Sequence, residues 1–303
     1  MSSAASSLRA AVDRNEVVVV CGTGGVGKTT ISAAVALDAA LRGRRVLVMT
    51  IDPARRLADS LGVSGQLNEA RKIDVEGLLG RKCAGEGALY AMMLDAEGTW
   101  KGLVHRHIKS EELQKRILDN RYFRRASDSL SGSQEYMAME RLLEVSRDDD
   151  FDLVVLDTPP SRNALDFLEA PSRMVRMFAE GGLRWLRLAE GGGFSSSRAG
   201  RALFGKTRQA MFSVFERFTG SEVISGIAEF VSLTSEIFDG MKVHASEVMD
   251  LLRGDTATFL LVASPNRISL SEALYFHDRL EEAEISFEGF VINRVRPRRV
   301  EDQ

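Results

Sequence analysis

Residues 17–30 read VVVVCGTGGVGKTT, an apolar run that leads into a glycine-rich turn. Such a run is typical of a strand that is buried on both faces of a parallel sheet. The pattern G-x-x-x-x-G-K-[ST] runs from Gly22 to Thr29, as in a phosphate-binding loop between a strand and a helix. Its glycines let backbone N–H groups converge on a phosphate, and the helix behind it adds a partial positive charge. The stretch therefore predicts an α/β protein that binds a nucleotide.

Two side chains of this loop have specific expected tasks. Lys28 should reach the β- and γ-phosphates, and the Thr29 hydroxyl should coordinate Mg²⁺. The backbone around them would enclose the phosphates. The predicted nucleotide-binding residues of the loop are Gly22, Gly24, Gly25, Val26, Gly27, Lys28, Thr29 and Thr30.

A dinucleotide fingerprint is an alternative interpretation, because Gly22, Gly24 and Gly27 also satisfy G-x-G-x-x-G. Asp52 would then be the acid that binds the ribose. Two observations count against this interpretation. The Lys-Thr pair that closes the loop has no role in the fingerprint, and Asp52 follows Gly22 by 30 positions, where about 20 are expected.

Short apolar runs alternate with helical patterns along the chain. The expected strands are residues 17–21, 45–51, 89–94, 153–157, 258–263 and 287–293, and the expected helices are 29–41, 134–145 and 269–282. This alternation predicts a mostly parallel, doubly wound sheet with ligands at the carboxyl ends of its strands. Residues 163–252 show helical spacing without a strand. We therefore expect one P-loop NTPase domain over residues 1–303 with a helical insertion at about 163–252.

An NTPase also needs an acid at the end of a second buried strand. Residues 151–157 read FDLVVLD and place Asp157 at that position. We assign Asp157 to the Mg²⁺ shell, through a water molecule. The alternative is an acid at a strand end that has no ligand.

Three motifs carry a resemblance to a known family. They are GTGGVGKTT at residues 22–30, DPARRLADSLG from Asp52 and DTPPSRNALDFLEAP from Asp157, and Asn293 follows a late strand in VINRV. In their order and spacing the chain resembles the ATPases of the arsenite-pump and tail-anchored-protein-targeting type (ArsA type), which have a deviant Walker A loop. The resemblance covers roughly residues 15 to 295.

The resemblance implies an Mg-dependent ATPase that acts as a dimeric switch. Asp52 would orient or deprotonate the attacking water, Lys28 would act with it in catalysis, and Asn293 would lie beside the adenine. The first switch would contain Asp52, Pro53, Arg55 and Arg56, and the second would contain Asp157, Thr158 and Pro159. The partner chain would be a second copy or a paralogous ATPase.

Thr23 departs from this family, which has a lysine there that reaches the phosphates of the partner chain. A cation placed on the transferred phosphate, such as an arginine finger, is worth about 10³–10⁵ in rate. Three explanations stay open. Thr23 could be a harmless variant, a partner paralogue could supply the lysine, or the chain could use a cation of its own from Arg55, Arg56 or Arg162.

The cysteines mark a second departure. Eukaryotic targeting members of the family bind zinc between two chains with a C-x-x-C pair, and the arsenite pumps bind metalloid with several thiolates. Cys21 and Cys83 are the two cysteines of this chain and are not spaced as a chelating pair. Since soft metals and metalloids need several thiolates, we expect neither zinc nor arsenite to bind.

The insertion is rich in large apolar side chains, with nine of the 15 phenylalanines between Phe167 and Phe238. Helical spacing puts two sets of them on common faces, namely Met174, Met177 and Phe178, and Met211, Phe215 and Phe218. The family resemblance implies a groove for a hydrophobic client helix here, and the alternative is the insertion's own core. Residues 173–217 carry nine Lys and Arg against three Glu, which fits an anionic membrane surface or a solvated face.

Composition narrows the class of protein. The net charge of −3 gives no general nucleic-acid signal, and no apolar run approaches the roughly 18 residues of a membrane span. The polar start lacks the apolar segment of a signal peptide, so we expect a cytoplasmic protein with, at most, peripheral contact to a membrane. The sequence thus favours an ATP-gated carrier or chaperone for hydrophobic or membrane-protein clients. The alternative is a regulatory ATPase subunit that pairs with a paralogue and hydrolyses ATP weakly alone.

Overall fold

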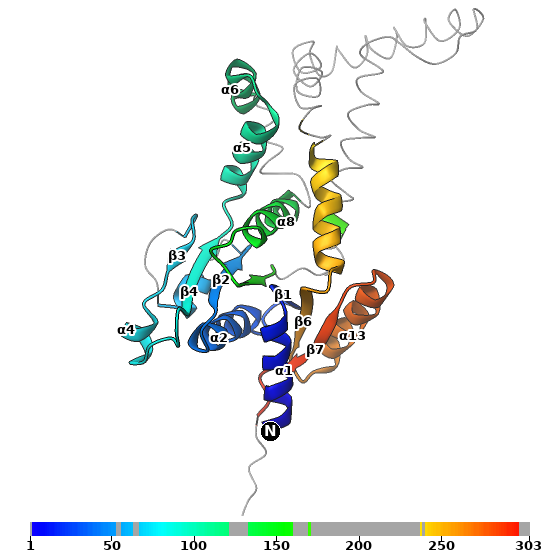
Figure 1. Ribbon diagram of the computed structural model, residues 1–303. Helices are drawn as coiled ribbons and strands as arrows, with labels where there is room; N and C mark the ends of the chain where they lie inside the picture. Colours follow the sequence, from blue (N-terminus) through cyan, green and yellow to red (C-terminus); the bar gives the residue numbers. More distant parts are fainter. Residues whose placement is uncertain are drawn as a thin grey trace, which may run out of the picture. The chain divides into compact units, whose positions relative to one another are not determined.

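A computed structural model describes residues 2–52, 56–62, 67–120, 133–159, 169–170, 237 and 240–296 (Figure 1). The chain divides into two compact units. The first comprises Met1–Ala96, Gln134–Ala170 and Ala245–Gln303, and the second comprises Glu97–Ser133 and Pro171–His244. The predicted insertion at 163–252 stays a prediction, because most of it lies outside the described residues.

The first unit is built on one seven-stranded sheet with the order β3-β4-β2-β5-β1-β6-β7. The strands are β1 (Val17–Gly22), β2 (Arg45–Thr50), β3 (Arg71–Lys72), β4 (Ala88–Met93), β5 (Leu153–Asp157), β6 (Ala257–Ala263) and β7 (Phe287–Ile292). Every neighbouring pair is parallel except β3 and β4. This confirms the predicted fold class, and all six expected strands lie in the sheet.

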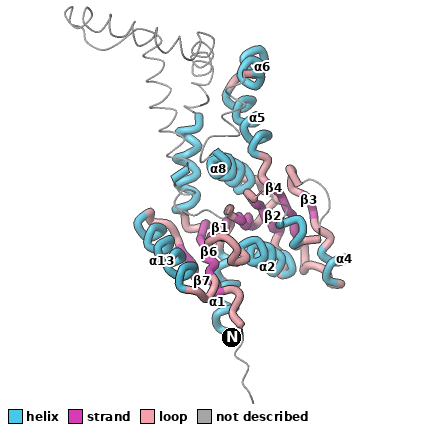
Figure 2. The backbone as a smooth tube through the Cα atoms, turned by 180° about the vertical axis from the view of Figure 1, so that it is seen from behind, coloured by secondary structure: helices cyan, strands magenta, loops and turns pink. Residues whose placement is uncertain are grey.

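Helices cover both faces of this sheet (Figure 2). On one face lie α1 (Ser2–Arg14), α2 (Lys28–Leu41) and α3 (Arg56–Ser60). On the other lie α8 (Ser133–Ser146), α13 (Arg267–Glu282) and a helix at residues 240–253. The remaining helices are α4 (Val75–Leu79) in the first unit and, mostly in the second, α5 (Ala96–His107) and α6 (Glu111–Asp119). None of the helices within these described ranges has the length and apolar character needed to cross a membrane.

The apolar run at the start of β1 is explained by this layering. Val17, Val19 and Cys21 pack into the core on the α8 side, whereas Val18 and Val20 pack into the core on the α2 side. Successive side chains of a strand point to opposite faces, so a strand covered on both sides needs apolar residues at every position.

The strand order places the expected ligand site at the end of β1. The chain builds the sheet from β1 outward through β2 and β4, returns with β5 between β2 and β1, and then adds β6 and β7 on the other side of β1. Ligands of doubly wound proteins bind outside the carboxyl ends of the strands where the order reverses. The glycine-rich loop directly follows β1 at that point.

We did not expect α1 or β3 from the sequence. Ala11 and Val12 of α1 are buried, and Val12 packs with the core under α2. β3 has two exposed residues that pair antiparallel with β4. β3 is too short for an apolar run, and most of the apolar residues of α1 are small alanines.

Leu47, fully buried in β2, provides a test of this core. Replacing it with Ala should lower the free energy of unfolding by about 2–5 kcal/mol, because the cavity closes only in part. Leu78→Ala, at an exposed position of α4, is the control and should change stability by about 0.5 kcal/mol or less. Urea unfolding followed by circular dichroism measures both, and equal losses would contradict the assigned core.

Candidate phosphate-binding site

The loop between β1 and α2 requires glycine at two positions. Gly22 has φ of 153°, and a Cβ there would lie 2.2 Å from the Val262 carbonyl oxygen of β6. Gly27 has φ of 95°, and a Cβ there would lie 2.4 Å from Nδ2 of Asn293. No side chain caps the α2 N-terminus, where Gly27 is the cap residue. The first N–H groups of α2 are therefore available to an anion.

Lys28 is nearly buried, with 6% of its surface exposed. Its Nζ donates hydrogen bonds to the carbonyl oxygens of Gly22 at 2.8 Å and Thr23 at 3.1 Å. Burial lowers the pKa of the Lys28 ammonium, and the Asp157 carboxylate opposes the change. Two neutral carbonyls are weaker partners for this ammonium than phosphate oxygens would be.

Asp157 is buried at the end of β5 and accepts hydrogen bonds from three hydroxyl groups. Its Oδ2 accepts from Thr29 Oγ1 at 2.7 Å and Thr50 Oγ1 at 3.0 Å, and its Oδ1 accepts from Ser32 Oγ at 3.4 Å. Burial raises the pKa of Asp157, and these hydrogen bonds and the charge of Lys28 oppose the rise. The carboxylate therefore sits where a positive charge would stabilise it.

These groups fit a hard divalent cation. Mg²⁺ is held by oxygen donors and is commonly shared between a carboxylate and substrate phosphates. The Thr29 hydroxyl and the Asp157 carboxylate supply such donors beside the phosphate loop. They are the residues that would hold Mg²⁺.

Two of the residues around Asp157 were not predicted from the sequence. Thr50 ends β2, is 1% exposed, and also accepts a hydrogen bond from the backbone N–H of Asp52 at 3.2 Å. Ser32 lies one helical turn after Thr29 on α2 and points to the same carboxylate. A polar residue at the end of a buried strand was the available signal for Thr50, whereas Ser32 had none beyond its spacing.

The first predicted switch lies beside this cluster. The Asp52 carboxylate is 2.8 Å from Nη1 of Arg56, the first residue of α3. The backbone of Asp52 is tied to Thr50, so a hydrogen-bonded path leads from Asp157 to the switch. Pro53 and Arg55 lie outside the described residues.

The second switch begins against β1. Both the N–H and the hydroxyl of Thr158 donate to the carbonyl oxygen of Val20, at 3.2 and 2.9 Å. Pro159 follows directly. The start of this segment is thus anchored to the strand that leads into the loop. Arg162 lies outside the described residues.

Asn293 follows β7 and reaches the phosphate loop. Its Nδ2 donates to the carbonyl oxygen of Val26 at 2.8 Å, and its Oδ1 accepts from the N–H of Arg294 at 2.8 Å. The structure thus brings the predicted adenine-side residue to the loop, which lies 267 positions earlier in the chain at Val26.

Thr23 turns toward a different element. Its Oγ1 lies 3.4 Å from Oγ of Ser269, a buried residue in the first turn of α13. The same Ser269 hydroxyl accepts from the N–H of Ser264 at 3.0 Å. Position 23, where the sequence resemblance predicts a lysine, therefore links the loop to the turn between β6 and α13. Ser269 was not foreseen from the sequence.

Burial raises the pKa of the Cys21 thiol, in β1, to about 12. Cys21 is therefore a neutral thiol near pH 7 and a poor metal ligand in that form. Cys83 is 62 positions further along the chain. The expectation that zinc and arsenite do not bind stays a prediction.

The remaining site predictions fall outside the described residues. These are the client-surface residues Met174, Met177, Phe178, Met211, Phe215 and Phe218.

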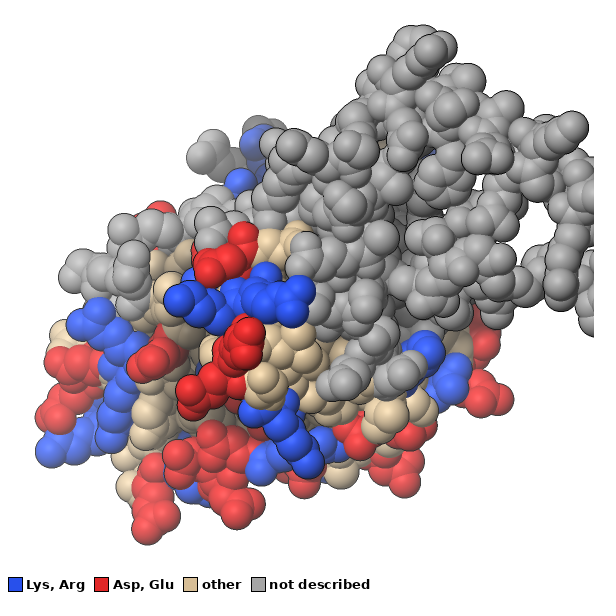
Figure 3. Space-filling model, turned by 90° about the horizontal axis from the view of Figure 1, so that it is seen from above, with Lys and Arg blue, Asp and Glu red and all other residues tan. Residues whose placement is uncertain are grey.

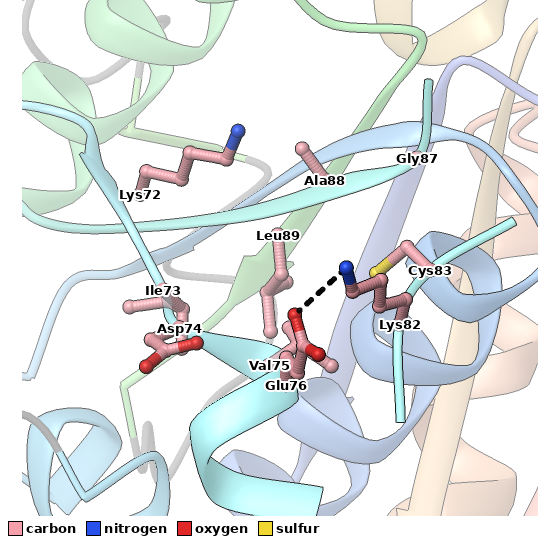
Figure 4. A pocket seen from close by; sticks show the side chains of 10 residues that line it. All are labelled: Lys72, Ile73, Asp74, Val75, Glu76, Lys82, Cys83, Gly87, Ala88 and Leu89. Atoms are coloured by element: carbon pink, nitrogen blue, oxygen red, sulfur yellow. Dashed lines mark ion pairs between the residues drawn. The ribbon is translucent and has the colours of Figure 1, made fainter. Parts of the chain in front are cut away.

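A separate pocket of about 530 Å³ lies where β4 begins, and Figure 4 shows the ten residues that line it. Gly87, Ala88 and Leu89 at the start of β4 line it, and Lys82 forms an ion pair with Glu76 at its rim. Because the glycine-rich loop lies at the carboxyl ends of the strands, this pocket is not part of the nucleotide site.

The raised pKa of Asp157 predicts a pH dependence of stability without nucleotide or divalent cations. The folded state binds the Asp157 proton more tightly than the unfolded state, so stability should fall as pH rises from the ordinary aspartate range through the raised pKa. Asp157→Asn removes the free-energy cost of burying the charged carboxylate. The variant should resist urea better than the wild type at pH 7.5, and its advantage should shrink at acidic pH.

Asp152→Asn is the matched control, because its hydrogen bond with Arg45 holds the pKa of Asp152 below its ordinary value. That carboxylate stabilises the fold above its ordinary pKa, and the contribution is lost as pH falls. Its replacement should therefore lower stability at pH 7.5. An Asp157→Asn variant that is less stable than the wild type at pH 7.5 would contradict the assigned penalty.

Comparison with known proteins places the chain in a family. It is similar to the ATPase GET3 of Malassezia globosa, with 25% identity over 275 residues that cover 90% of this chain and 71% of the relative. It is 25% identical to the ATPase get3 of Schizosaccharomyces pombe over 282 residues, which cover 92% of this chain and 73% of the relative. With the ATPase GET3 of Podospora anserina it shares 29% identity over 155 residues, which cover 51% of this chain and 42% of the relative.

The sequence model of the family described as anion-transporting ATPase matches residues 15–184. The match spans more than half of the chain and includes the glycine-rich loop and both switch motifs. It confirms the resemblance found in the sequence: the chain belongs to the anion-transporting ATPase family.

Proposed function

We propose that this protein binds and hydrolyses Mg-ATP and works as a dimeric switch that carries hydrophobic or membrane-protein clients. The observation that carries the proposal is the cluster at the carboxyl end of β1. There Lys28, Thr29 and Asp157 meet within hydrogen-bonding distance of the loop or of each other, and Asp52 lies beside them.

Each residue of the cluster has a task in hydrolysis. The loop N–H groups and Lys28 bind the phosphates. Thr29 and Asp157 would hold Mg²⁺, which would neutralise phosphate charge. Asp52 orients a water molecule and accepts its proton as the water oxygen bonds to the γ-phosphorus. The bond from that phosphorus to the bridging oxygen breaks, and ADP and phosphate leave.

Hydrogen bonds connect this chemistry to both switches. Thr50 joins the Asp157 carboxylate to the backbone of Asp52, and Thr158 is fixed to β1 through Val20. These bonds fix the first residue of each switch at the sheet, so binding or release of the γ-phosphate would move the residues that follow Asp52 and Thr158, which is a common route from hydrolysis to movement. A second chain that docks on the switches would respond to the nucleotide.

The client proposal rests on the family resemblance and on the methionine and phenylalanine residues between positions 167 and 238. Surfaces rich in methionine adapt to varied apolar partners.

We propose a cytoplasmic protein with peripheral membrane contact rather than a nucleic-acid-binding protein. Basic and acidic side chains are interleaved on the visible part of the described surface (Figure 3), whereas nucleic acid favours an extended basic face.

Thr23 favours a second candidate, a regulatory subunit that pairs with a paralogous ATPase. The Thr23 side chain is neutral and lies against Ser269, so it cannot supply the charge that a lysine would. Such a subunit would bind ATP but turn it over slowly by itself, and a paralogue would complete the site.

Steady-state hydrolysis of Mg-ATP by the purified chain tests the main proposal, with native mass recorded in parallel. Lys28→Ala should reduce turnover by at least about 10²-fold, because it removes the ammonium aimed at the phosphates. Lys72→Ala is the control, since this exposed lysine of β3 lies at the separate pocket. Binding without turnover would favour the regulatory subunit, and turnover that survives Lys28→Ala would contradict both candidates.

Gly27→Ala and Gly25→Ala form a pair that tests the geometry of the loop. Both glycines have positive φ, but only the Gly27 Cβ would meet Asn293, whereas a Gly25 Cβ has no neighbour within 4 Å. Both variants carry a backbone cost of about 1–2 kcal/mol, because an alanine at positive φ brings its Cβ too close to the backbone. Calorimetry should show that Gly27→Ala weakens ATP binding about tenfold more than Gly25→Ala. Equal affinities would contradict the assigned contact.

A further inference from the structure

Arg56 and Asp52 form an ion pair between groups of unequal exposure. Arg56 Nη1 lies 2.8 Å from Asp52 Oδ2, and the residues are four positions apart at the start of α3. The Arg56 side chain is 62% exposed, whereas that of Asp52 is 13% exposed. The carboxylate is thus set into the site, and the guanidinium reaches it from the solvent side.

Asp52 has an anchor that does not depend on this pair. Its backbone N–H donates to Thr50 Oγ1, and Thr50 in turn donates to the buried Asp157 carboxylate. If the guanidinium moves away, the backbone of Asp52 keeps its place at the end of β2. Arg56 can therefore change partners without moving that backbone.

Arg56 also lies within electrostatic range of the phosphate loop. Burial lowers the pKa of the Lys28 ammonium, the carboxylates of Asp157 and Asp52 oppose this, and the charge of Arg56 lowers it further. The hydrogen-bonded path from Asp157 through Thr50 to Asp52 also places Arg56 at the same end of the sheet as the loop. Position 23 offers no such charge, because Thr23 is neutral and faces Ser269.

We propose that Arg56 is the cation that this chain itself supplies to the γ-phosphate, and that without the γ-phosphate it is held on Asp52. The inference rests on the proposed ATPase function and deepens it. The γ-phosphate draws the guanidinium away, so that Arg56 no longer neutralises the Asp52 carboxylate when this carboxylate accepts the proton of the attacking water. ADP lacks that phosphate, so the ion pair re-forms after phosphate leaves.

A contact between Arg56 and phosphate is stronger than its ion pair with Asp52, which favours this exchange. The Arg56 guanidinium is largely exposed, so water screens its attraction to Asp52 and the long Arg56 side chain must be ordered to make the ion pair. A guanidinium bound to phosphate through two parallel N–H groups is stronger and more directional. The exposed position of Arg56 lets it make either contact with little rearrangement of the core.

The test compares Arg56→Ala, Arg56→Lys and Arg9→Ala with the wild type. Arg9 is the matched control, since it is 57% exposed and pairs with Asp38 at 2.8 Å between α1 and α2. Calorimetry gives the dissociation constants of Mg-ADP and of the non-hydrolysable analogue Mg-AMP-PNP, and steady-state assays give kcat. The binding ratio is measurable even if turnover is slow.

Arg56→Ala should raise the dissociation constant of Mg-AMP-PNP about tenfold relative to that of Mg-ADP. It should also lower kcat by about 10²-fold or more. Arg56→Lys should recover part of the preference for Mg-AMP-PNP over Mg-ADP, because lysine restores the charge without the planar pair of donors. Arg9→Ala should change neither quantity.

Three results would overturn the inference. They are an unchanged ratio and kcat in Arg56→Ala, a kcat that rises because Arg56 only restrained Asp52, or equal losses for ADP and the analogue, as a structural role would give. A wild type that binds neither nucleotide would overturn the ATPase proposal as well. A wild type that binds and hydrolyses ATP, with Arg56→Ala unaffected, would remove the role of Arg56 alone.

Discussion

The buried carboxylate of Asp157 joins the parts of this protein that the site needs. In the sheet it lies opposite Val20 of β1 and Thr50 of β2, at the point where the strand order reverses. Hydroxyl groups from α2 and β2 donate to its two oxygens. A buried charge is costly unless it is hydrogen-bonded. The hydrogen bonds that Asp157 accepts therefore fix the positions of the loop, of α2 and of the residues at the end of β2 relative to one another.

Asp157 and Lys28 are two charged groups of the site whose charges burial disfavours. Burial works against the charged form of Asp157 and against the charged form of Lys28, although the two groups partly compensate each other. A cation beside Asp157 and a phosphate beside Lys28 would each stabilise the group that burial disfavours. Binding would then favour the folded state, because the ligand acts on charges that are unfavourable without it.

The sequence predicted the parts of the fold and site that depend on local pattern. The runs of β1, β5 and β6 are apolar at nearly every position because both faces of the sheet are covered, and the glycine-rich loop follows β1 as its spacing required. Thr50, Ser32 and Ser269 were not assigned, because none of them belongs to a recognised ligand motif and their partners lie more than 100 positions away in the chain. β3 was missed because two exposed residues carry no periodic pattern.

Thr23 is neutral, and its hydroxyl contacts Ser269 of the same chain. The family resemblance predicts a lysine here that carries charge to a neighbouring chain, whereas the Thr23 hydroxyl lies beside Ser269 within its own chain. Arg56 lies four residues after Asp52 on the same switch. If Arg56 replaces the lost charge, the cation for the phosphate and the acid for the water neutralise each other until the γ-phosphate separates them. One binding event would then release both, and ATP would be distinguished from ADP within a single chain.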